Sequence, residues 1–323
     1  SVAMKVYNFS TIFHMLGLLL LFNATAMYIC SLLSASADDG AMNGLLYSAF
    51  ITTGVALVAL VTTRNRKREI RKRDGYLTVV LGWLSMVLFG TLPYLLTGAL
   101  ESYSDALFET MSGFTATGAT IFQDIEALPK SIILWRSLTH WLGGMGIIVL
   151  AVAILPLLGI GGVQLFSAEA TGLGGDKLHP RISDTAKRLW YIYVGFTALE
   201  AILLSLAGMT VFDAVNHSMS TMASGGFSTK NESLAYWNHR PVIQYIVTIF
   251  MFLAGTNFVL IYFGLKGKLQ RIWQDNEFRW YIGFVTFFTL ITFIGIYTNV
   301  NLQSTAVDHP QVLGEFESSF RHA

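Results

Sequence analysis

The hydrophobic positions of the chain gather into seven long runs that contain few charged residues. The hydrocarbon core of a membrane is about 30 Å thick, and a helix needs roughly 20 apolar residues to cross it. The runs come close to this length, and the segments between them are more polar. We therefore predict seven membrane-spanning helices, near residues 10–33, 44–63, 76–97, 131–158, 189–211, 241–265 and 280–298.

The composition agrees with that prediction, because 53% of the residues are hydrophobic and only 13% are charged. A soluble domain carries about 25% charged residues. The formal net charge is +1 and the basic residues lie in a few loops, so we expect no nucleic-acid partner. The single cysteine, Cys30, excludes an internal disulfide, and the seven histidines lack the spacing of a metal site. We predict an all-α polytopic membrane protein without a cofactor.

The lysines and arginines predict the orientation of the helices, because cytoplasmic loops carry the excess of these residues. Segment 64–75 contains "RNRKREIRKRD", with seven basic residues, and segments 163–188 and 266–279 contain four each. The alternate loops contain four in total. We therefore expect a cytoplasmic N-terminus and a cytoplasmic loop at 64–75. This loop could serve only to orient the protein, or it could also bind anionic lipid or a cytoplasmic partner.

Two short segments between the apolar runs resemble each other. "DALFETMSGFTATGATIF" begins at Asp105 and "DAVNHSMSTMASGGFST" begins at Asp213, and they align without a gap at an offset of 108 residues. The flanking runs follow a similar offset. A unit of span, short segment and span therefore occurs twice, at 76–158 and at 189–265.

The first part of each short segment is expected to be a helix that enters the membrane without crossing it. Ten residues from Asp105 to Phe114 would reach about 15 Å, which is half of the hydrocarbon thickness. Asp105 and Asp213 are expected to be the N-caps. The C-terminal end of each helix, with its partial negative charge, would then point into the membrane and favour a cation.

Small residues follow each short helix, as "TATGAT" at 115–120 and "ASGGFS" at 223–228. Extended backbone at membrane depth is tolerated where it is packed in protein or lines a wet cavity, as the carbonyl ligands of cation filters are. Gly118, Gly225 and Gly226 would permit the dihedral angles that turn successive carbonyls inward. The alternative is a pair of ordinary outer loops, but two copies in equivalent places favour the filter.

The chain resembles the Trk/Ktr/HKT superfamily of potassium transporters, and within it the bacterial TrkH-type membrane subunits. The resemblance rests on "SGFTATGAT" at 112–120, "HWLGGMGIIVLAVAILPLLGIGG" at 140–162 and "MSTMASGGFST" at 219–229. It implies repeated units of helix, pore helix and helix, of the potassium-channel type, around one pore. It further implies an N-terminal helix pair at 1–63, a first pore unit at 76–158, a second at 189–265, and the start of a third at 280–323 that stops before its filter.

The resemblance also implies the site and its partners. Potassium would be the transported ion, no reaction would be catalysed, and coupling to sodium or protons stays open. The expected setting is the bacterial inner membrane, with membrane lipid, a homodimer and a cytoplasmic nucleotide-binding ring protein as partners. Potassium would bind the backbone carbonyls of Ala116, Thr117, Gly118, Ser224, Gly225 and Gly226.

Three polar residues within the apolar runs need partners or water. Glu200 is expected to make a structural hydrogen bond or ion pair, with Arg136 as one candidate partner. Arg136 and His140 are expected to extend toward the outer surface of the membrane. Two alternatives stay open: a polytopic membrane enzyme with a buried site around these three residues, and a non-conducting fragment.

Overall fold

The computed structural model describes residues 7–64, 72–144, 146 and 182–298. The regular secondary structure of these residues is helical, with no strand among them. Five of the helices are long and apolar enough to cross a membrane, and a bent pair could form a sixth span. The prediction of an all-α polytopic membrane protein is therefore confirmed.

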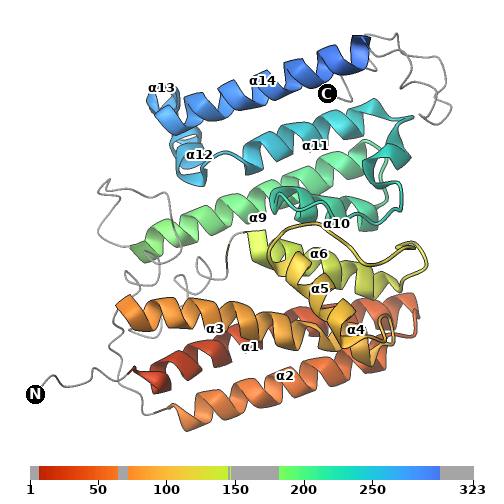
Figure 1. Cartoon of the computed structure of the whole chain (residues 1–323), viewed down its shortest axis with the longest axis vertical. Coiled ribbons are helices and arrows are strands. Elements are labelled where there is room, and N and C mark those ends of the chain that lie inside the picture. The colour runs from red at the N-terminus through yellow and green to blue at the C-terminus, as the bar shows by residue number, and fades with distance from the viewer. Residues whose placement is uncertain (1–6, 65–71, 145, 147–181, 299–323) are drawn as a thin grey trace, which may run out of the picture.

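The N-terminal helices form one side of the molecule (Figure 1). They occupy the first three predicted apolar runs, and α4 continues the direction of α3 as part of one span. Gly44 lets α2 approach α4 closely, since a Cβ at this position would lie 2.5 Å from the Leu96 carbonyl oxygen. The helices are α1 (Phe9–Ala37), α2 (Met42–Thr62), α3 (Lys72–Gly90) and α4 (Leu92–Leu96).

Asp39 joins these helices to the centre of the molecule. Its carboxylate accepts hydrogen bonds from the Ser34 hydroxyl at the end of α1 and from the Ala41 amide before α2 (3.2 Å). It also accepts one from the Ser131 amide (2.9 Å), in the first turn of α6 (Lys130–Gly144). One carboxylate thus satisfies free amides at the starts of two helices and fixes the α1–α2 hairpin against α6.

Two short helices lie among the longer ones (Figure 1): α5 (Tyr103–Phe114) and α10 (Val211–Met222). Each contains 12 residues, and both their first and their last residues are 108 positions apart. α6 contacts both α5 and α10, so it stands between the two copies. The remaining central elements are α9 (Ile182–Leu206), η2 (Ser233–Trp237) and α11 (Pro241–Ala254).

The predicted N-caps of the short helices are wrong by three residues. The caps are Ser102 and Thr210, and Asp105 and Asp213 lie in the first turn. In α10 the Thr210 side chain accepts from the Asp213 amide (3.1 Å) and donates to its carboxylate (2.7 Å). A capping threonine is often followed three residues later by an acid, and the two side chains bond each other's end of the first turn. The prediction took the acid of this pair for the cap.

The prediction of a single helix at 241–265 is wrong, although the two helices found there could together form one broken span. α11 ends at Ala254, and α12 (Phe258–Leu265) leaves at an angle of 106°. The Asn257 side chain accepts from the Val259 amide (3.0 Å) and so caps a new helix inside an apolar run. α13 (Leu269–Gln274) and α14 (Asn276–Thr298) follow.

Parts of three predictions lie outside the described residues. These parts are most of the basic loop at 64–75, the end of the run at 131–158 beyond α6, and residues 299–323 of the predicted third unit. α14 covers the predicted run at 280–298, and many of its large apolar side chains are exposed.

Candidate functional site

The first segment, residues 115–120, leaves α5 through a left-handed turn. The Ala116 amide donates to the Gly113 carbonyl (3.0 Å) and the Thr117 amide donates to the Ser112 carbonyl (2.9 Å). Ala116 has a φ of +52°, in the left-handed region that usually holds glycine at the end of a helix. The two bonds satisfy carbonyls at the end of α5 and reverse the chain direction there.

The second segment, residues 223–228, repeats this turn after α10. The Ser224 amide donates to the Thr221 carbonyl (2.8 Å) and the Gly225 amide donates to the Ser220 carbonyl (3.0 Å). Ser224 has a φ of +54°. Donors and acceptors are each displaced by 108 residues from those of the first segment, so the two copies share backbone conformation as well as sequence.

The two segments touch at their glycines. Gly118 has a φ of +78° and Gly226 a φ of +142°, so both hold positions that other residues rarely adopt. A Cβ at Gly118 would lie 2.9 Å from the Gly225 carbonyl oxygen and 3.3 Å from the Gly226 Cα. The sequence therefore predicted the need for glycine correctly at these two positions, and at Gly118 the second segment leaves no room for a side chain.

Gly225 is a glycine for a different reason from the one predicted. It is not among the residues with a positive φ. A Cβ there would lie 2.3 Å from His140 Nδ1, so the missing side chain makes room for the imidazole ring of α6.

His140 is buried against the second segment, and the prediction that it reaches toward the outer surface is wrong. Its ring is 0% exposed and stacks on Phe227 with centroids 3.9 Å apart. Its Nδ1 lies 3.2 Å from the Ser220 hydroxyl, which also accepts from the Gly226 amide (3.0 Å).

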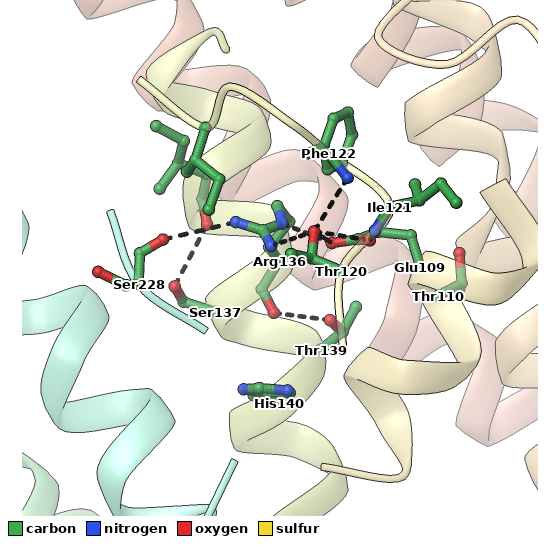
Figure 2. Close-up of polar contacts among 12 residues, drawn as sticks. Glu109, Thr110, Thr120, Ile121, Phe122, Arg136, Ser137, Thr139, His140 and Ser228 are labelled. Atoms are coloured by element: carbon green, nitrogen blue, oxygen red, sulfur yellow. Dashed lines mark hydrogen bonds and ion pairs between the residues drawn. The ribbon is translucent and has the colours of Figure 1, made fainter. Parts of the chain in front are cut away.

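Arg136 is also buried, at 1% exposed, and its partner is Glu109 rather than Glu200. Arg136 Nε donates to Glu109 Oε1 at 2.7 Å, and the two side chains meet between α6 and α5 (Figure 2). Glu109 was not among the residues predicted from the sequence. The available signal was a carboxylate in the middle of a helix that was expected to lie within the membrane.

Glu200 lies on α9 and is 0% exposed. The Thr221 side chain of α10 approaches its carboxyl group, but neither oxygen makes a hydrogen bond of normal geometry within the described part of the chain. Arg136, the candidate partner for Glu200, is wrong, because Arg136 pairs with Glu109. In the described residues no group of three or more metal-ligating side chains comes together.

Glycines of the "LGGMG" sequence pack α6 against both short helices. A Cβ at Gly143 would lie 2.1 Å from the Phe114 carbonyl oxygen, at the end of α5. A Cβ at Gly144 would lie 2.5 Å from the Ala223 Cα, just after α10. Adjacent residues of one helix thus fix the ends of both short helices.

A family model described as "TrkH: Cation transport protein" matches residues 44–311, which is most of the chain. This chain belongs to the TrkH family. The predicted resemblance is thereby confirmed. The family is thus one of cation transport proteins.

Named relatives agree with the TrkH assignment. The chain is 41% identical over 279 residues to "Trk system potassium uptake protein TrkH" of Salmonella typhimurium, an alignment that covers 85% of this chain and 58% of the relative. It is 41% identical over 289 residues to the protein of the same name from Halomonas elongata, covering 88% and 60%.

The fold is similar to the crystal structure of the potassium transporter TrkH from Vibrio parahaemolyticus, with a TM-score of 0.77 and 36% identity. That match covers 97% of this chain and 62% of the crystallised chain. The TrkH-family chain thus spans 58% to 62% of the length of these three proteins.

Proposed function

We propose that this chain supplies two pore units of a potassium-conducting membrane subunit of a Trk system. The first unit is 76–158 and the second 189–265, and an N-terminal helix pair (1–63) and the start of a third unit (280–323) flank them. The proposal is supported by relatives that are named potassium uptake proteins and by the geometry of the two segments.

The single observation that carries the proposal is the repeated backbone at the ends of the two short helices. Ala116 and Ser224 share one left-handed turn, and Gly118 and Gly226 both have positive φ angles two residues later. Alternating backbone handedness can bring successive carbonyls to one side of a strand. Such carbonyls replace the hydration shell of a cation in selective filters.

The ends of α5 and α10 contribute electrostatically to this function. Each helix ends directly before its segment, and the C-terminal end of a helix carries about half a negative charge. Two such ends beside a row of carbonyls favour a dehydrated cation without a charged ligand. We assign potassium binding to the carbonyls of Ala116, Thr117, Gly118, Ser224, Gly225 and Gly226.

The setting follows from the same proposal. The apolar helices would cross the bacterial inner membrane with the N-terminus and the basic loop at 64–75 on the cytoplasmic side. Membrane lipid would surround them, because large apolar side chains lie exposed along α2 and α14. A homodimer and a cytoplasmic nucleotide-binding ring protein complete the proposed assembly.

A chimera tests the proposal. Residues 44–311, which the family model matches, would replace the corresponding segment of the Salmonella typhimurium relative, in bacteria that lack their own potassium uptake. We expect the chimera to restore growth at low potassium and to take up rubidium, a potassium analogue. A chimera that reaches the membrane in normal amounts but restores neither would contradict the proposed function.

A further inference from the structure

The guanidinium group of Arg136 contacts the last residue of each segment, Thr120 and Ser228. Its Nη2 donates to the Thr120 hydroxyl at 3.0 Å, at the end of the first segment. Its Nη1 donates to the Ser228 carbonyl at 3.5 Å, at the end of the second (Figure 2). Its Cζ lies 4.1 Å from the centre of the Phe227 ring, within range of a cation–π contact.

Glu109 completes the connection on the side of the first segment. Besides the pair with Arg136, its Oε2 accepts from the Ile121 amide at 3.0 Å and from the Thr120 hydroxyl at 3.0 Å. The same hydroxyl accepts from the Phe122 amide at 3.2 Å. Removal of this carboxylate would therefore remove the hydrogen bonds to Thr120 and Ile121 at the end of the first segment. It would also leave Arg136 without its counter-charge.

The second copy has no equivalent charge pair. At the offset of 108, Glu109 corresponds to His217 and Arg136 corresponds to Gln244. His217 Nε2 lies 3.3 Å from the Ser228 hydroxyl, which takes the place of the contact between Glu109 and Thr120. The Thr229 hydroxyl, next in the chain, donates to Asp213 Oδ1 at 2.6 Å, so the end of the second segment has uncharged and charged local contacts of its own. The arginine of the first copy adds a contact from outside the second unit.

A buried charge pair contributes little net stability to a fold. Apolar residues of similar volume often do as well, because two charges must be removed from water. What an arginine adds is a rigid planar fork whose donors point in fixed directions. Here the donors of Arg136, a residue of α6, reach α5 and the last residues of both segments. We therefore assign the pair a role in holding these backbone stretches in place.

We propose that Arg136 and Glu109 are positioning residues that hold the last residues of the two filter segments, Thr120 and Ser228, at a fixed separation. Potassium discrimination depends on this separation. The proposal rests on the function proposed above. It makes the two units unequal, because a pair that belongs to the first unit fixes both segments.

The test uses the chimera with three variants. Arg136→Lys keeps the charge but loses the fork, and Glu109→Leu with Arg136→Met replaces the pair by apolar side chains so that no unpaired charge is buried. Glu101→Gln is the matched control, because Glu101 is an exposed carboxylate that precedes α5 and lies outside both segments. The readouts are the ratio of potassium to sodium flux and hydrogen exchange of the backbone at 116–122 and 224–229.

We expect Arg136→Lys and the double variant to lower the flux ratio about tenfold, since a lysine or methionine cannot replace the fork, while Glu101→Gln leaves it unchanged. We also expect faster exchange in both backbone stretches. A double variant at normal yield with an unchanged ratio and unchanged exchange would overturn the proposal. If the unmodified chimera carries no potassium, the proposed function fails. In that case the rate of hydrogen exchange at 224–229 tests the positioning role by itself. If this rate is the same in the variants as in the unmodified chimera, the positioning role is refuted.

Discussion

Replacement of Gly143 by alanine should destabilise the protein although alanine is the better helix former. Gly143 lies in the last turn of α6, where a glycine costs a helix about 0.5–1 kcal/mol relative to alanine. In this place, however, the added methyl group would lie 2.1 Å from the Phe114 carbonyl oxygen, 2.7 Å from its carbonyl carbon and 3.0 Å from its Cα.

The steric cost should exceed the gain in helix propensity. All three atoms belong to the backbone of α5, so no side chain can rotate away. The helix end must move by about 1.4 Å to restore ordinary contacts of about 3.5 Å. Overpacking of this kind costs about 1–3 kcal/mol, occasionally more. We therefore expect a net destabilisation of about 1–2 kcal/mol, together with displacement of the first segment.

Gly54→Ala is the matched control. Gly54 is an exposed residue of α2, and a Cβ there would meet nothing within 4 Å. The same substitution should stabilise the protein at this position by about 0.5–1 kcal/mol. Thermal unfolding of the purified chain in detergent compares the two Tm values with that of the unmodified chain. If Gly143→Ala raised Tm as Gly54→Ala does, the close packing of α6 on α5 would be refuted.

Two further predictions concern the loops. Asp39→Asn should lower Tm near neutral pH, because the folded protein stabilises the charged form of the Asp39 carboxyl. Partial burial raises the pKa of this carboxyl, but hydrogen bonds from Ser34 and backbone amides lower it by more, so the net change is a decrease. A lowered pKa stabilises the fold above the unfolded pKa of about 3.9, and this stabilisation is lost as pH falls through the folded pKa. The Tm difference from the variant should therefore begin to shrink at about pH 4 and vanish at lower pH; a constant difference would argue against it. Cysteine at Arg64 should be labelled only from the cytoplasmic side and cysteine at Glu232 only from outside, with buried Cys30 silent. The reverse pattern would invert the topology.

Features that repeat along the chain could be predicted from the sequence. The apolar runs gave most of the long helices, because hydropathy depends on local composition. The offset of 108 residues gave the two short helices, and the end of α5 at Phe114 agrees with the prediction. Small residues after each helix marked Gly118 and Gly226 as conformationally special, and their φ angles agree.

Features that depend on packing between helices could not be predicted. Arg136 could have paired with any buried acid, and only the contact of α5 with α6 selects Glu109 over Glu200. The break near Asn257 is invisible to hydropathy because both flanking helices are apolar. The role of Gly225 requires the position of the His140 ring, which comes from a helix about 80 residues earlier in the chain.

The central claim is that the two segments form part of one potassium filter. Gly118→Ser and Gly226→Ser in the chimera test it most directly, because each puts a side chain where φ is positive, and the first also crowds the Gly225 carbonyl. The measurement is the permeability of potassium relative to sodium in liposomes. We predict that both variants lose discrimination at normal protein levels. Discrimination equal to that of the unmodified chimera in both would contradict the claim.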